Sequence, residues 1–229
     1  MRPRATFKQI SRSLMDSWIS SPDGLGNPED IYGPFCKLAR PNMVLLVVDV
    51  RATNPLDFGI DVIQGYRLPT GLADIGTLQR SRSFADVPDT KYLNETVIPA
   101  YVGAVQRQRP TMGRVATRVL DTVIGYDQII LPQKNSSGRS EWCIGLLDIH
   151  FLLPAASKDG SLDDVDLTIL QLLAEGSSTK EIASASNLSH RTIEHRIDIL
   201  KSRFQARNIA HLAVLSVSAG LGGIVAKDP

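Results

Sequence analysis

The stretch SSTKEIASASNLSHRTIEHRIDILKSRF, residues 177–204, has the pattern of two short helices joined by a tight turn. Ser178 opens a capping box, because Glu181 follows three residues later and can return a hydrogen bond to the Ser178 amide. Ser189 stands at the N-cap position of the second helix. This second helix is amphipathic, and its apolar stripe consists of Ile193, Ile197, Leu200 and Phe204. The pattern predicts a helix pair with one buried face and one polar face.

The polar face of the second helix carries hydrogen-bonding side chains at His190, Arg191, Glu194, His195, Asp198 and Lys201. Such groups can bond to base edges or phosphates when a helix lies in the major groove of DNA. Residues 178–207 hold six basic and three acidic side chains, whereas residues 161–177 hold four acidic and no basic ones. This distribution favours a small, oriented phosphate-binding surface. As the alternative, arginines such as Arg196 are solvated or paired with Glu194 and Asp198.

Two further helices flank the pair. The first is expected over residues 163–174, with Ser161 as its N-cap and Gly176 in the left-handed position that follows a helix. Its inward stripe is predicted to be Leu167, Leu170, Leu173 and Ala174. A fourth helix is expected over residues 208–220. Residues 161–229 are therefore predicted to form an all-α, four-helix domain.

This C-terminal segment resembles the LuxR-type (GerE-like) helix-turn-helix family over roughly residues 160–222. The resemblance rests on Leu-Leu-Ala-x-Gly ending the first helix, Lys-Glu-Ile-Ala in the second and Leu-Ser-x-x-Thr-Ile-Glu-His in the third. An Arg-Asn pair before the fourth helix completes the set. The resemblance implies a transcription-regulator domain whose third helix reads the major groove and whose fourth helix supports dimerisation.

The resemblance also implies roles for individual residues. Contacts with backbone phosphate are implied for Thr179, Lys180, Ser189, Lys201 and Arg203. Base-reading positions are His190, Arg191, Glu194, His195 and Asp198. Thr192 is expected to pack or to contact phosphate. The sequence departs from the family pattern at Arg196, where a histidine is usual, and an acidic Asp198 on the reading face leaves the base assignment open.

The preceding part of the chain, residues 1–154, is predicted to be an α+β domain. Strands are expected over 43–50, 58–66, 114–120, 125–131 and 141–153, with a hairpin loop at 134–140. Helices are expected before residue 20, over 31–39 and over 94–107. Trp142 and Cys143 are core candidates. This order resembles a PAS-like sensor domain, which implies a five-stranded antiparallel sheet with helices on one face. Residues 155–160 are expected to be a linker.

The N-terminal helix has a basic side and an apolar side, the latter formed by Ile10, Leu14, Met15 and Trp18. It is expected to pack on its own domain or on a dimer partner. A basic arm that touches DNA is the alternative.

Composition excludes several classes of protein. The chain has 229 residues, of which 43% are hydrophobic and 21% charged, as in soluble globular proteins with room for two cores. Its apolar runs are too short to cross a bilayer, and no secretory signal is visible. Cys36 and Cys143 have neither metal-site nor disulfide spacing, which indicates the reducing cytoplasm and no metal site. There is no nucleophile–base–acid constellation and no Gly-rich phosphate loop, so an enzyme is not expected.

The sequence therefore predicts a sequence-specific transcriptional regulator that binds double-stranded DNA as a homodimer. Its PAS-like N-terminal domain is expected to sense a signal or to mediate dimerisation. A regulator that senses an acyl-homoserine lactone is an alternative, although the two Trp and five Tyr residues are not grouped along the sequence. A second alternative is a protein-interaction module that has lost DNA binding and docks a partner. The sequence identifies no cofactor or ligand.

Overall fold

The computed structural model describes residues 5–66, 77–120, 122–136, 138–154 and 162–218. The chain divides into two compact units, Met1–Leu152 and Leu153–Pro229. The predicted linker at 155–160 lies outside the described residues, as do Arg2 and Arg4 at the N-terminus. None of the described helices is long and apolar enough to cross a membrane.

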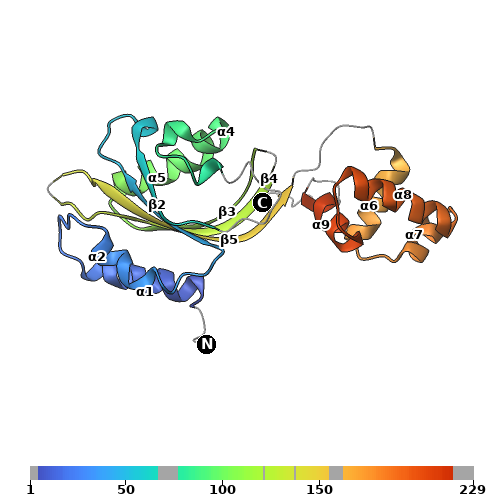
Figure 1. The fold of residues 1–229 in the computed structure, drawn as a ribbon, viewed down its shortest axis with the longest axis horizontal. Coiled ribbons are helices and arrows are strands. Elements are labelled where there is room, and N and C mark those ends of the chain that lie inside the picture. Colours follow the sequence, from blue (N-terminus) through green and yellow to red (C-terminus); the bar gives the residue numbers. More distant parts are fainter. Residues whose placement is uncertain (1–4, 67–76, 121, 137, 155–161, 219–229) are drawn as a thin grey trace. The chain divides into compact units, whose positions relative to one another are not determined.

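The N-terminal unit is built on a five-stranded antiparallel sheet with the order β2-β1-β5-β4-β3 (Figure 1). The strands are β1 Met43–Asp49, β2 Gly59–Gln64, β3 Thr111–Val119, β4 Thr122–Pro132 and β5 Trp142–Pro154. All five strands predicted from the sequence are present. The first and last strands pair, with Met43 opposite Asp148, so that they form the centre of the sheet.

Helices cover both faces of this sheet, whereas the sequence predicted helices on one face only. Helices α1 (Phe7–Ser20) and α2 (Glu29–Tyr32) lie on one face, and α4 (Thr90–Tyr92) and α5 (Ile98–Arg107) on the other (Figure 1). The reason lies in β5, where Trp142, Cys143 and Ile144 are successive residues and all three are buried. Since successive strand residues point to opposite faces, neither face of β5 can be left to water.

Helix α1 packs within its own domain. Ile10 and Leu14 are buried in the core beneath the sheet, and the Trp18 Nε1 donates a hydrogen bond to the Pro132 carbonyl at 2.6 Å. The helix begins with a capping box between Thr6 and Gln9. These contacts confirm that α1 packs on its own domain. The apolar side of α1 is buried against the sheet.

The helix predicted over 94–107 begins earlier and contains a wider turn. Thr90–Tyr92 is α-helical, Leu93–Val97 forms a π-helical turn (η4), and α5 follows without a break. Pro99 lies just after this turn and has no amide hydrogen to donate to the carbonyl four residues before it. A π turn accommodates such a gap, and these turns occur often at functional sites. The side chains of Tyr92, Val97 and Tyr101 project from this segment toward the sheet.

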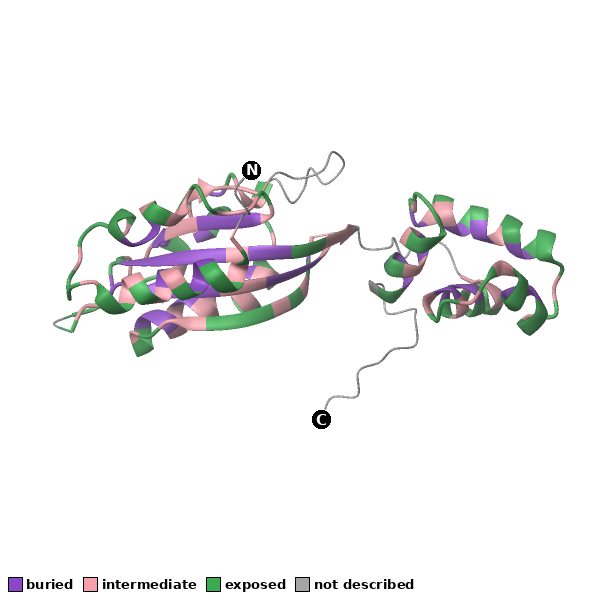
Figure 2. Cartoon of the chain, turned by 90° about the horizontal axis from the view of Figure 1, so that it is seen from below, coloured by how far each residue is buried: buried purple, intermediate pink, exposed green. Residues whose placement is uncertain are grey.

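The C-terminal unit consists of α6 Asp164–Ala174, α7 Thr179–Ala185, α8 His190–Arg203 and α9 Ile209–Ser218. Its core includes Ile193, Ile197, Leu200 and Phe204, the predicted stripe of the second helix of the pair. Figure 2 shows these helices with buried inner faces and exposed outer faces. Predicted helix residues beyond 218 lie outside the described part of the chain.

For α6, Leu170 and Leu173 are buried as predicted, but the predicted cap and the inward position of Leu167 are wrong. The predicted cap, Ser161, lies outside the described residues, and the helix is capped by Asp163, whose carboxylate accepts the Asp166 amide at 2.8 Å. Leu167 is 37% exposed, whereas Ile169 is fully buried beside Leu170. The inward stripe is therefore Ile169, Leu170 and Leu173, because α9 packs on the side of α6 that carries Ile169 rather than Leu167.

Candidate functional site

Hydrogen bonds at the helix ends fix the geometry of the α7–α8 pair. The Ser178 Oγ accepts the Glu181 amide, and the Glu181 carboxylate accepts the Ser178 amide at 2.7 Å, as predicted. Ser189 caps α8 by accepting the Thr192 amide at 3.1 Å, and the two hydroxyls lie 2.7 Å apart. Ser178 and Ser189 thus have structural roles as caps, and Thr192 is bonded to the second of them. A Ser or Thr cap can still offer its hydroxyl to a phosphate oxygen.

The exposed face of α8 carries the predicted base-reading residues. His190, Arg191, Glu194 and His195 are all exposed. The His190 Nδ1 lies 3.4 Å from the Glu194 carboxylate, so these two side chains interact with each other. Arg191 and His195, by contrast, have no ion-pair or hydrogen-bond partner for their side chains within the described parts of the chain. They lie four residues apart on one helix face and are free to meet a base edge.

The cations predicted to contact phosphate differ in whether an acidic side chain already lies beside them. Lys180 at the start of α7, next to Thr179, is exposed, and its side chain has no described partner. The Lys201 Nζ lies 2.7 Å from the Asp198 carboxylate, and the Arg203 guanidinium lies 3.8 Å from that of Asp166. The structure therefore leaves Lys180 fully available and places Lys201 and Arg203 beside acidic groups.

Arg196 joins α8 to the start of α6. Its Nη1 lies 2.7 Å from one Asp163 carboxylate oxygen and 2.8 Å from the Asp166 carboxylate. The alternative of a pair with Glu194 or Asp198 is wrong, because Arg196 points across to the neighbouring helix. The Asp166 amide and the Arg196 guanidinium lower the pKa of Asp163, and the two carboxylates raise the pKa of Arg196. Two of the acidic residues that flank the basic patch thus fix the orientation of α8.

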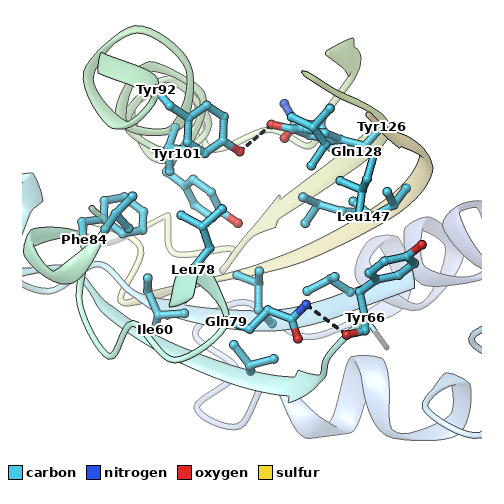
Figure 3. A pocket seen from close by; sticks show the side chains of 18 residues that line it. Ile60, Tyr66, Leu78, Gln79, Phe84, Tyr92, Tyr101, Tyr126, Gln128 and Leu147 are labelled. Atoms are coloured by element: carbon cyan, nitrogen blue, oxygen red, sulfur yellow. Dashed lines mark hydrogen bonds between the residues drawn. The ribbon is translucent and has the colours of Figure 1, made fainter. Parts of the chain in front are cut away.

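The N-terminal unit contains a cavity of about 150 Å³ between the sheet and the α4–α5 segment (Figure 3). Its walls come from β1, β2, β4 and β5 and from the helices above them. The lining residues are Val44, Leu46, Ile60, Val62, Tyr66, Leu78, Gln79, Phe84, Val87, Tyr92, Val97, Tyr101, Ile124, Tyr126, Gln128, Leu147, Ile149 and Leu152. No charged side chain is among these described lining residues. The cavity therefore suits a neutral, largely apolar molecule.

Four of the five tyrosines of the chain line this cavity, although they are dispersed along the sequence. The Tyr92 and Tyr126 hydroxyls are hydrogen-bonded at 2.8 Å, and the Gln79 amide donates to the Tyr66 carbonyl at 3.1 Å (Figure 3). Burial raises the pKa of both Tyr101 and Tyr126, so that these phenols stay neutral at physiological pH. Sequence reasoning missed this grouping, because the tyrosines come from separate segments.

A metal site requires several ligating side chains close together. Within the described ranges, no three His, Cys, Asp or Glu side chains lie close enough to hold a metal ion. Cys143 is buried, and burial raises the pKa of its thiol to about 12. The thiol is therefore inert at neutral pH.

Residues 161–216 match the family model described as bacterial regulatory proteins, luxR family. This segment is a LuxR-family DNA-binding domain. The match spans α6, α7, α8 and most of α9, and it confirms the resemblance drawn from the sequence. Within the LuxR-family domain, α7 and α8 are the helix-turn-helix pair.

The chain also has weak similarity, over most of its length, to solved structures. The crystal structure of the phage VqmA–DPO complex has 18% identity over 94% of this chain and 93% of that chain, with a TM-score of 0.35. A structure of the Vibrio cholerae VqmA dimer has 15% identity over 80% and 86%, with a TM-score of 0.31. Escherichia coli SdiA has 13% identity over 95% and 99%, with a TM-score of 0.29. No protein among those with curated descriptions matches the chain.

Proposed function

We propose that this protein is a homodimeric, non-enzymatic transcriptional regulator whose PAS-like N-terminal domain senses a small neutral molecule. The proposal of DNA binding rests on one observation, the exposed face of α8 in the LuxR-family domain. There Arg191 and His195 stand without described partners, on a helix that capping bonds and the Arg196 ion pairs hold in place. Such a regulator acts in the cytoplasm, where bacterial DNA lies.

DNA contacts divide between the two helices of the pair. Lys180 at the start of α7 and Arg207 after α8 are exposed, with no described side-chain partner, and they suit phosphate contacts. Thr179, Ser189, Lys201 and Arg203 border the same helices and can add further backbone contacts. Arg191 and His195 provide donors for base edges, with His190 and Glu194 beside them. Phosphate contacts then set the register, while α8 supplies the sequence preference.

Helix α9 supports the homodimer. Ile209, Val214 and Val217 are between 42% and 48% exposed, although α9 is an apolar helix whose other side is buried against α6. An apolar stripe of this kind on a soluble domain is typical of an interaction surface. A second copy of α9 is the occupant we propose, since a two-fold dimer places two copies of α8 one turn of DNA apart.

The cavity supports the sensing role. It lies between the sheet and the α4–α5 segment, and the helical segment that contains the π turn at Leu93–Val97 places Tyr92, Val97 and Tyr101 in its wall. The five-stranded antiparallel sheet supports the assignment of a PAS-like domain. No Trp or Asp side chain is among the described lining residues, and these are residue types that a pocket for an acyl-homoserine lactone is expected to need.

The test of DNA binding is its dependence on salt. The logarithm of the affinity for a promoter fragment should fall linearly with the logarithm of salt concentration, with a slope of about 0.9 per phosphate contacted. A Lys180→Ala, Lys201→Ala, Arg207→Ala triple variant should bind more weakly and with a smaller slope, because it contacts fewer phosphates. Fluorescence anisotropy at several salt concentrations measures both quantities.

The control for this experiment is Arg12→Ala, which removes an exposed cation from α1 in the other unit. It should leave both affinity and slope unchanged. If the triple variant kept the wild-type slope, the orientation of α7 and α8 on DNA proposed above would be wrong. If the wild-type protein bound no DNA at any salt concentration, the alternative would be supported, namely a protein-interaction module that has lost DNA binding.

A further inference from the structure

The hydroxyl of Tyr101 lies inside the cavity without a protein partner. Tyr101 is only 6% exposed, yet its Oη makes no hydrogen bond with any described residue. The neighbouring hydroxyls of Tyr92 and Tyr126 are hydrogen-bonded to each other, so each has a protein partner, whereas Tyr101 has none among the described residues. The Tyr101 Oη is not sealed in the packed core but borders the open space of the cavity, where a molecule can reach it.

Gly145 makes room for this hydroxyl. A Cβ atom added at Gly145 would lie 2.4 Å from the Tyr101 Oη and 3.2 Å from Leu46 Cδ1. Any side chain on β5 at this point would therefore displace the phenol. In Figure 3 the Tyr101 ring reaches down from α5 toward the sheet, and its hydroxyl end points into the space between Leu78 and Leu147. The fold thus places a phenol oxygen without a protein partner in a mostly apolar wall, which also contains the Tyr92–Tyr126 pair and the amides of Gln79 and Gln128.

The size and charge of the cavity restrict what could meet this atom. An apolar cavity of about 150 Å³ can hold a ring the size of benzene. A charged group would lose its hydration without gaining an opposite charge, since the described lining residues include none. The neutral phenol of Tyr101 can either donate one hydrogen bond or accept one. An uncharged ring with one polar substituent fits the volume of the cavity, carries no charge and can form a hydrogen bond with the Tyr101 hydroxyl.

We infer that the Tyr101 Oη is the hydrogen-bond partner of the sensed molecule, and that this molecule is a neutral, single-ring compound with a hydrogen-bonding group at its edge. The inference rests on the proposed sensing function and deepens it by naming the class of ligand. Leu78, Leu147 and Phe84 enclose the apolar body of the ring. Tyr101 fixes its orientation and rejects rings that lack the polar group, because such rings leave the hydroxyl unpaired.

Phenol and toluene test this inference, because the two rings have nearly the same size and differ by one hydroxyl. The full-length protein should bind phenol more tightly than toluene, and benzoate, which carries a charge, should not bind. Tyr101→Phe should weaken phenol binding roughly tenfold and leave toluene binding unchanged within about twofold. Chemical-shift titration by NMR gives both dissociation constants. The control is Tyr32→Phe, which removes the hydroxyl of a buried tyrosine on the other face of the sheet and should change neither constant.

Thermal unfolding without added ring provides the second measurement. Tyr101→Phe should keep or raise the Tm, because it removes a hydroxyl that has no partner among the described residues. A clear fall in Tm would show that the hydroxyl is satisfied in the free protein and would overturn the inference. Equal phenol affinity in wild type and Tyr101→Phe would overturn it too, while leaving the cavity as a binding site. Binding of neither ring to the wild type would overturn both the inference and the proposed sensing function.

Discussion

At the scale of single residues, Arg196 shows that charge in a DNA-binding helix does not imply a DNA contact. Its guanidinium is within 2.8 Å of carboxylates from both Asp163 and Asp166, and its side chain is 30% exposed. The residue therefore holds α8 against the N-terminal end of α6. Asp163 also caps α6, so one carboxylate serves two structural purposes. The cations left for phosphate are those outside this cluster.

This cluster predicts how the LuxR-family domain responds to acid. The pKa of Asp163 is lowered in the folded protein by the Asp166 amide and by Arg196. The stability that Asp163 contributes is thus present above about pH 4, where the unfolded carboxylate is also ionised, and is lost as the pH falls through the lower folded pKa. Asp163→Asn keeps a capping side chain but cannot titrate. The variant should lose less Tm than the wild type between pH 5 and pH 3, measured by circular dichroism.

The matched control is Asp164→Asn, one residue further on. This change removes an exposed carboxylate that has no partner among the described residues. The Tm of this variant should follow the wild-type pH dependence. An Asp163→Asn curve parallel to that of the wild type would contradict the role assigned to the ion pair.

At the scale of elements, the sequence predicted most helices and strands because their signals are local. Capping residues Ser178 and Ser189, the left-handed Gly176 and the stripe of α8 lie where the sequence placed them. The errors arose where an element meets a distant one. Leu167 is exposed, and α1 and α5 lie on opposite faces of the sheet, because the partner that covers each side chain comes from elsewhere in the chain.

Gly176 gives a prediction that concerns the link between α6 and α7. Its φ is +88°, and a Cβ atom added there would meet nothing within 4 Å. Gly176→Ala should therefore destabilise the LuxR-family domain by about 1 to 2 kcal/mol through backbone conformation alone. Urea unfolding of the full-length protein, followed by circular dichroism, measures this loss. Gly26→Ala is the control, because Gly26 has equal space without a positive φ, and its change should stay within about 0.5 kcal/mol.

At the scale of the whole molecule, the proposed mechanism needs two copies of the chain. A single LuxR-family domain offers few free cations, since Arg196 is used in packing and Lys201 is paired with Asp198. Two domains related by a two-fold axis double the number of phosphate contacts and read two half-sites. In the proposed dimer, both the affinity and the length of sequence that is read are therefore greater than for one copy.

Val214→Glu tests this assembly. Val214 is 48% exposed on the apolar side of α9, so a carboxylate there should leave the domain folded but would be buried without a partner in a dimer. The variant should sediment as a monomer at concentrations where the wild type is a dimer, and should bind a two-fold site more weakly. Ser184→Glu, at an exposed position of α7, should leave the sedimentation unchanged. A dimeric Val214→Glu protein would place the interface elsewhere.

The sequence by itself determined the LuxR-family domain, since caps, amphipathic stripes and family markers all lie within about sixty residues of one another. It also determined the five strands, because alternation and turns are local signals. Only the tertiary structure decided which acids hold Arg196, and that Tyr66, Tyr92, Tyr101 and Tyr126 gather at one cavity. These side chains come from segments far apart in the chain, and their proximity depends on strand order and helix packing, which no local pattern encodes.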